Sequence, residues 1–441
     1  MSRAARTRSA PRRWGPRAIA TRLIIGAAAV LPFVALAFDG LNQSAPAAIG
    51  AGVAMLVATA AVLLFGRERL IPLRQVYVPT IALGLAMLAG MARIAFPLAG
   101  LDQDPGAIPI ELVKIAGFAA CTITGLLIAA HPRRLERLLA WIVYAGGIYV
   151  IVALVAGEPL IVEVERSQIE RFGGTLANTN AAGCAFGMLA LLALGRARAL
   201  VQQPQFYQFE SRHIAALGAT GAIAFFAFAA CALTQSRTAL AGTIILALVL
   251  LLGDIRRGKL IALAAIGALV VVVAALLEVG DATAGRLDTL TEDAASRWAG
   301  YRHLAGVVGE APWFGHGLGS FMATNVAHLN ATRAPSMWNW GAGHNIIIHA
   351  LVEGGWAVTA PILAAWGAIA VQIARGASAT AGASAPVAAV VLALLCASVD
   401  IALNVPAVAA FTALLLGVAW GSHTLSVRRG SSARLLLANQ R

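Results

Sequence analysis

The residue in this chain best suited to acid–base chemistry is a histidine at the edge of an apolar run. His344 stands in the stretch GAGHNIIIHALVEGG, directly before a long apolar segment. Histidine changes charge near neutral pH, so the His344 imidazole could accept a proton from an attacking hydroxyl group, with Asn345 orienting the ring. The alternative reading of His344 is structural, as a cap at the start of a helix.

Arginines with polar neighbours form a second group at the ends of apolar runs. Arg171 leads the stretch RFGGTLANTN, and Arg237 lies in TQSRT, a short link between two runs. An arginine stays ionised at any relevant pH, and its planar guanidinium group matches phosphate oxygens. The pattern indicates a site for a phosphate-bearing ligand, although each arginine could instead contact lipid headgroups. The polar neighbours that would support the two arginines are Asn178, Asn180, Gln235 and Ser236.

Two carboxylates are placed inside apolar runs, where they are costly. Glu353 lies nine residues after His344, which is about 13 Å along a helix, and Asp400 lies near the end of a later run. Such carboxylates usually face the interior of a helix bundle or a polar cavity. If Asp400 lies near His344, it could hold the imidazole in one tautomer. Hydrogen bonding between helices explains Glu353 as well as a chemical role does.

A metal-dependent reaction is the competing possibility. The stretch LDQDPG contains Asp102 and Asp104, an acidic pair of the kind that holds a divalent ion in some transferases, but the pattern is short and common by chance. His344 and His349 are five residues apart, so they would lie on different faces of a helix and lack the spacing of a zinc-binding pair. We therefore expect no metal and no cofactor.

The elements that must position these residues are membrane helices. Of the 441 residues 59% are hydrophobic and only 12% are charged, whereas a soluble globular protein carries about 25% charged residues. Apolar runs long enough to cross a bilayer recur along the whole chain. We expect an all-α, polytopic integral membrane protein with about 12 transmembrane helices. The expected spans are 18–38, 45–65, 76–97, 110–130, 137–156, 177–195, 213–233, 238–253, 259–278, 345–373, 384–402 and 405–423.

The basic residues indicate orientation rather than nucleic-acid binding, despite a net charge of +13. With these spans, 23 Lys and Arg residues fall on one face of the membrane and seven on the other, so the richer face is predicted to be cytoplasmic. The expected organisation is a basic cytoplasmic tail (1–17), transmembrane helices 1–9 (18–279), a long periplasmic loop with short helices (280–344), transmembrane helices 10–12 (345–423) and a cytoplasmic tail (424–441).

The order of the motifs resembles the O-antigen ligase and polymerase family. From residue 171 to residue 355 the chain carries RFGGT-x-x-N-x-N, TQSR, RW in the long loop, PWFGHGLGSF and HNxxxHxxxExG, in that order. The resemblance implies a metal-independent, inverting glycosyltransferase of the bacterial inner membrane, with its active site facing the periplasm. Such an enzyme moves a glycan from undecaprenyl diphosphate to an acceptor sugar. The acceptor is the lipid A-core for a ligase and another lipid-linked repeat unit for a polymerase.

The resemblance also implies roles for single residues. His344 would be the catalytic base, and Arg171 and Arg237 would bind the diphosphate. Arg297 and Arg302 could move onto the donor as the long loop closes. A competing hypothesis, from another functional class, is a twelve-span transporter or flippase. Such a protein tends to place its charged residues near the middle of the membrane. Most of the polar groups here gather instead at one side.

Overall fold

Helices are the regular secondary structure of the described part of the chain. The computed structural model describes residues 15–68, 70–96, 103–157, 171–203, 206, 208, 210–252, 290–331, 333–376 and 381–438, and it contains no strand in these ranges. The expected all-α polytopic fold is confirmed. The expected ninth span, 259–278, lies outside the described residues, and so does Asp102.

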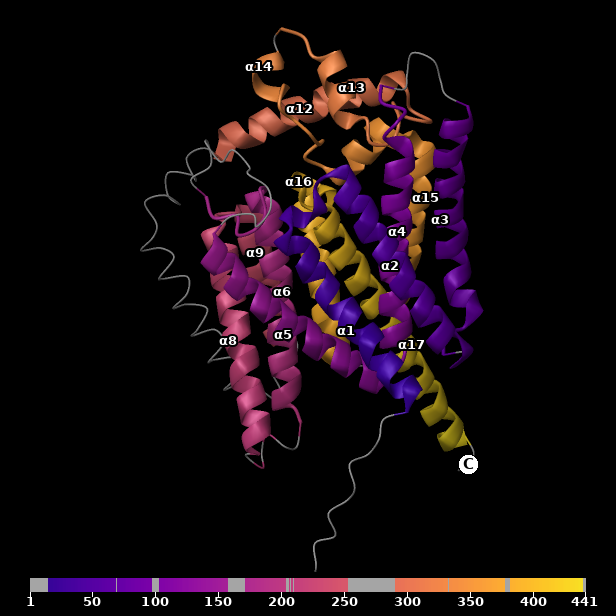
Figure 1. Ribbon diagram of the computed structural model, residues 1–441, viewed down its shortest axis with the longest axis vertical. Helices are drawn as coiled ribbons and strands as arrows, with labels where there is room; N and C mark the ends of the chain where they lie inside the picture. The colour runs from indigo at the N-terminus through magenta and orange to yellow at the C-terminus, as the bar shows by residue number, and fades with distance from the viewer. Residues whose placement is uncertain are drawn as a thin grey trace, which may run out of the picture.

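The other expected spans correspond to described helices (Figure 1). Their positions could be predicted because each apolar run continues until a glycine, a proline or a cluster of polar residues ends it. Nine described helices are long and apolar enough to cross a membrane, whereas α9 and the apolar part of α16 are shorter. The helices are α1 (Pro16–Ala37), α2 (Ser44–Phe65), α3 (Leu73–Ala95), α4 (Ile108–Ala129), α5 (Pro132–Ala156), α6 (Thr179–Val201), α8 (Ser211–Leu233), α9 (Arg237–Leu252), α15 (Ile346–Gly376), α16 (Ala381–Val399) and α17 (Pro406–Ala438).

Helices α6 and α17 form the centre of the bundle. In their apolar windows 72% and 89% of the residues are buried, against 44% or less in the other long spans. Helix α17 approaches α4 closely through Gly417 and Gly421. A Cβ atom on Gly417 would lie 2.0 Å from the carbonyl oxygen of Thr122. Since lipid is as apolar as leucine, membrane helices gain most from such close packing of small residues.

Polar segments gather at one end of the bundle, opposite the N-terminus of α1 and the C-terminus of α17 (Figure 1). Three helices of the long loop, α12 (Leu290–Glu310), α13 (Phe321–His328) and α14 (Ala334–Met337), lie across this end. Two short 3-10 turns, η1 (Asp39–Leu41) and η3 (Ala402–Asn404), join membrane helices at the same end. We call this end of the molecule the loop end.

Helix α15 is broken one third of the way along its length. Gly355 has φ 56° and ψ −166°, a backbone conformation that only glycine adopts readily. A Cβ atom on Gly355 would lie 2.4 Å from the carbonyl carbon of Trp313, and one on Gly315 would lie 2.4 Å from the carbonyl oxygen of Glu353. The two glycines therefore let the loop and the broken helix touch backbone to backbone.

Backbone hydrogen bonds hold residues 312–317 in the break of α15. The amides of His316 and Gly317 donate to the carbonyl groups of Val352 and Glu353 at 2.8 and 3.0 Å. In return the amides of Trp356 and Ala357 donate to carbonyl groups of the loop at 2.9 and 2.8 Å. A broken helix at membrane depth is tolerated only where protein satisfies its free backbone groups. The PWFGHG stretch does so here.

We expect Gly355→Ala to loosen this contact. The added methyl group meets the backbone of Trp313, and the left-handed conformation is strained for alanine by about 1–3 kcal/mol. The purified variant should melt at a lower temperature, and a protease should cleave its 290–344 segment faster than in the wild type. Gly367→Ala on the same helix is the control, because a Cβ atom at Gly367 meets nothing within 4 Å. Equal protease sensitivity of the two variants would contradict this role of Gly355.

Candidate active site

A buried carboxylate lies at the centre of the candidate site. Asp400 follows the last residue of α16 and is only 6% exposed. Its Oδ2 atom accepts hydrogen bonds from Asn180 Nδ2 at 2.6 Å and from Arg297 Nη2 at 3.0 Å. Its Oδ1 atom accepts from the amide of Ile401 at 2.7 Å and lies 3.8 Å from His344 Nδ1. One carboxylate thus connects α6, α12, α16 and the segment before α15.

Arg171 extends this network on the side of α6. Its Nη2 atom donates to Asn180 Oδ1 at 3.1 Å, so that Asn180 bridges Arg171 and Asp400. The Nε and Nη2 atoms of Arg171 also donate to the carbonyl oxygen of Thr234, at 3.1 and 2.8 Å. Thr234 begins the short link to Arg237. The two motifs RFGGT and TQSR, which are about 60 residues apart, therefore meet through a main-chain carbonyl group.

His344 is held by its surroundings from several sides. Its ring centroid lies 4.6 Å from that of Trp340, and Tyr301 donates from its hydroxyl group to the His344 carbonyl oxygen at 2.8 Å. Burial lowers the pKa of His344 below its ordinary value; the Asp400 carboxylate partly offsets this, and the Arg297 charge adds to it. The net lowering favours a neutral imidazole at pH 7, the form that can accept a proton.

Backbone strain is concentrated around this site. Within the described ranges, four residues other than glycine have positive φ angles, and all belong to segments at the loop end. They are Asp39 (50°), Leu41 (58°), Gln235 (53°) and His344 (47°). Such conformations cost free energy and persist only where the surrounding structure holds them, which is common at functional sites. The strain gives a reason, independent of side-chain chemistry, to place a site here.

The remaining arginines differ in how close they lie to Asp400. Arg237 is half-buried at the first residue of α9, one residue after the buried Ser236. Arg297 reaches Asp400, whereas Arg302 is exposed. Five residues turn a helix through roughly 140° beyond a full turn, so Arg297 and Arg302 cannot share a face of α12. The structure therefore does not bring Arg302 to the site.

Two of the expected supporting asparagines serve the helix ends. Asn178 accepts a hydrogen bond from the amide of Ala181 at 2.8 Å and so caps α6. Asn345 accepts from the amides of Ile347 and Ile348 at 3.0 and 3.1 Å, which caps α15, and it donates to the carbonyl group of Ser398 at 2.8 Å. The Asn345 side chain thus fixes the helix that follows His344 and ties it to α16.

Glu353 belongs to a second polar group, away from Asp400. Its Oε1 atom accepts from the amide of Phe321, the first residue of α13, at 3.2 Å and lies 3.4 Å from His349 Nε2. An ion pair between Lys114 and Glu111 on α4 belongs to the same region. These contacts give Glu353 a structural task, because they fasten α13 to α15.

Three contributors to the site were not among the residues expected from the sequence. Tyr301 and Trp340 touch His344, and the Thr234 carbonyl group holds Arg171. A signal existed for Tyr301, since it follows Arg297 by four residues and must lie on the same face of a helix. The Thr234 carbonyl group left no signal in the side-chain pattern.

A comparison with known protein families found a match. Residues 222–363 match the family model described as O-Antigen ligase. This segment includes Arg237, Arg297 and His344, whereas Arg171 and Asp400 lie outside it. The comparison with curated proteins returned no match. The matched segment and the helical membrane fold support the resemblance of this chain to the O-antigen ligase and polymerase family.

Proposed function

We propose that this protein transfers a glycan from undecaprenyl diphosphate to a sugar hydroxyl group of the lipid A-core, as an O-antigen ligase. The observation that carries the proposal is the convergence of Arg171, Arg297 and His344 on one pair of linked side chains, Asn180 and Asp400. A general base and fixed cations within one polar group are what glycosyl transfer from a diphosphate requires.

The proposed reaction begins with the acceptor hydroxyl group. Its oxygen attacks the anomeric carbon of the donor glycan while His344 takes the hydroxyl proton. The bond between the anomeric carbon and the diphosphate oxygen breaks, and its electron pair leaves with the diphosphate. Attack opposite the leaving group inverts the anomeric configuration. The Asp400 carboxylate, 3.8 Å from His344 Nδ1, stabilises the imidazolium that forms.

The arginines would stabilise the leaving group without a metal. Arg171 and Arg297 are each held by oxygen partners, so their charges are oriented before the substrate arrives. Such preorganised charges stabilise a developing anion without reorganisation during the reaction. Arg237 is three residues from the carbonyl group that Arg171 contacts, which supports a place beside it on the diphosphate.

The placement of the site at the loop end supports a periplasmic location in the bacterial inner membrane. Basic residues cluster at the other end of the bundle, as expected for the cytoplasmic side. A water-soluble glycan and a lipid tail meet only at the membrane surface. The loop end is therefore where the bond between sugar and diphosphate must lie.

Replacing His344 tests the proposed base. His344→Ala should lower the rate of glycan transfer by about 10²–10⁴-fold, the usual contribution of a general base. Transfer from labelled lipid-diphosphate glycan to lipid A-core can be measured with purified, reconstituted protein. His303→Ala, on the same loop, is the control and should keep the wild-type rate. Full activity of the His344→Ala variant would remove the proposed base.

The pH dependence of the rate tests the neighbours of His344. The neutral imidazole is the active form, so the rate should fall on acidification, with a midpoint below the ordinary histidine pKa of about 6.5. Asp400→Asn removes the charge that raises this pKa and should move the midpoint to lower pH. Arg297→Gln removes a charge that lowers it and should move the midpoint to higher pH. Shifts in the same direction would contradict the assignment.

Chelation separates the arginine mechanism from a metal-dependent one. If fixed arginines stabilise the diphosphate, transfer should keep its rate in excess EDTA. Loss of activity in EDTA and its return with a divalent ion would favour the alternative built on Asp102 and Asp104. Of that pair the structure describes only Asp104, which is exposed.

A further inference from the structure

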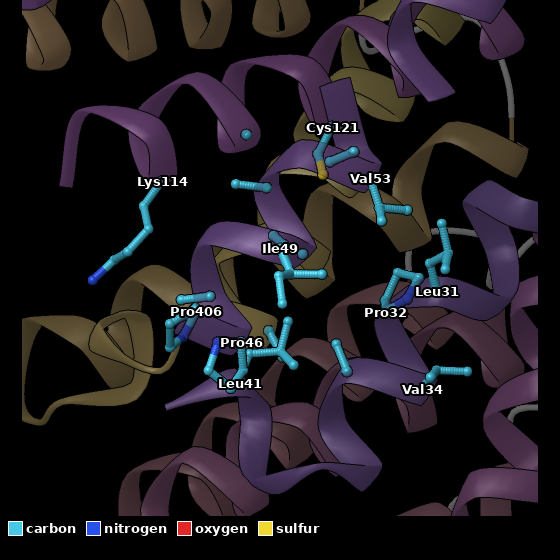
Figure 2. A pocket seen from close by; sticks show the side chains of 18 of the residues that line it. Leu31, Pro32, Val34, Leu41, Pro46, Ile49, Val53, Lys114, Cys121 and Pro406 are labelled. Atoms are coloured by element: carbon cyan, nitrogen blue, oxygen red, sulfur yellow. The ribbon is translucent and has the colours of Figure 1, made fainter. Parts of the chain in front are cut away.

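A large apolar cavity opens among four membrane helices, apart from the polar group around Asp400. It has a volume of about 430 Å³ and lies between α1, α2, α4 and α17 (Figure 2). Its walls include Leu31, Ile49, Val53 and Cys121, and several small residues line it as well. Pockets for small molecules span about 300–1,000 Å³, so this cavity is large enough to hold part of a ligand.

The cavity lies in the half of the bundle nearest the loop end. Its lining residues fall within 28–39, 41–57, 114–124 and 406–414. On α1, α2 and α17 these are the segments closest to η1 or to the start of α17, which lie at the loop end, whereas the segment of α4 is the middle of that helix. The cavity is thus on the side of the membrane that carries the candidate active site.

A strained turn separates the cavity from the candidate active site. Asp39 of η1 lines the cavity, and its Oδ1 atom accepts a hydrogen bond from the amide of Ala177 at 2.8 Å. A Cβ atom on Gly40 would lie 2.4 Å from Val405, the residue before the cavity-lining Pro406. Ala177 and Val405 are close in sequence to Asn180 and Asp400. The turn η1 therefore links the cavity wall to the segments that carry Asn180 and Asp400.

We propose that this cavity holds the polyprenyl chain of the donor lipid, next to the diphosphate. The inference rests on the proposed function. The polyprenyl chain is bonded directly to the diphosphate, so its first units must enter the membrane beside the arginines. The acceptor hydroxyl group of a core glycan is separated from its own acyl chains by sugars. Proximity of the cavity to the site therefore favours the donor chain as its occupant.

Shape rather than hydrophobicity would hold the chain. Lipid is already apolar, so moving the chain from the bilayer into the cavity gains mainly van der Waals packing. Ala54 and Ala410 lie on α2 and α17 and leave room where larger side chains would fill the cavity. A chain held there directs the diphosphate towards the arginines.

The test compares ligands with and without a chain. Binding of undecaprenyl diphosphate and of inorganic diphosphate is measured for the purified full-length protein in nanodiscs. Two variants fill the cavity from different walls, Ala54→Phe and Ala410→Phe. Leu56→Phe is the control, because Leu56 on α2 is 72% exposed and lies outside the cavity lining. Each variant is first checked for monodisperse elution; if one aggregates, the other carries the test.

We expect both cavity variants to bind undecaprenyl diphosphate about tenfold more weakly than the wild type, the loss that corresponds to roughly ten van der Waals contacts. Inorganic diphosphate should bind them as it binds the wild type, and Leu56→Phe should leave both affinities unchanged. Wild-type affinity for undecaprenyl diphosphate in a cavity variant would overturn the inference and leave the proposed reaction standing.

Two further outcomes separate the inference from the proposed function. If filling the cavity weakens binding of phosphatidylglycerol as much as that of undecaprenyl diphosphate, the cavity takes ordinary membrane lipid and the inference is wrong. If the wild type binds undecaprenyl diphosphate but not inorganic diphosphate, and filling the cavity still weakens the former, the chain site stands. The proposed arginine site then fails.

Discussion

One buried negative charge holds together the segments that make up the candidate site. An isolated carboxylate inside a membrane bundle is costly, and its cost is reduced only by charged or hydrogen-bonding partners. Asp400 finds them in Arg297, Asn180 and His344, which come from three other parts of the chain. The fold is therefore constrained to bring these parts together. The same contacts place the carboxylate beside the imidazole, as the proposed reaction requires.

The long loop is positioned by backbone contacts and by a hydrophobic cluster in which Leu304, Val307, Phe321 and Met337 pack with Val352 of α15. Its 312–317 segment enters the break in α15, where free carbonyl and amide groups need partners. Glu353 adds a side-chain contact to the amide of Phe321. Through these contacts α12 and α13 are fixed above the bundle, and Arg297 on α12 can reach Asp400. The motifs PWFGHG and HNxxxHxxxExG thus form one structural unit.

The sequence predicted the membrane helices well, because the length of an apolar run and the residues that end it are local properties. It predicted the residues of the site less completely. Asp400 was linked to His344 only conditionally, since 56 residues separate them and no periodicity connects two different helices. Arg297 and Arg302 were both expected to move onto the donor, although their spacing of five residues already places them on different faces of a helix. Asn178 and Asn345 could have been recognised as helix caps from their positions. The cavity left no signal, because its lining residues come from four different helices.

Strained backbone and regular helices occupy different parts of this protein. Most of the bundle consists of regular helices that pack through small residues, such as Gly417 against α4. The left-handed residues Asp39, Leu41, Gln235 and His344, and the break at Gly355, lie in segments near the loop end. Strained backbone must be stabilised by its neighbours, and the regular core provides that support. In the proposed reaction a lipid-linked sugar is attacked at the membrane surface, where irregular backbone can expose polar groups to it. The same irregularity deeper in the bilayer would leave those groups without partners.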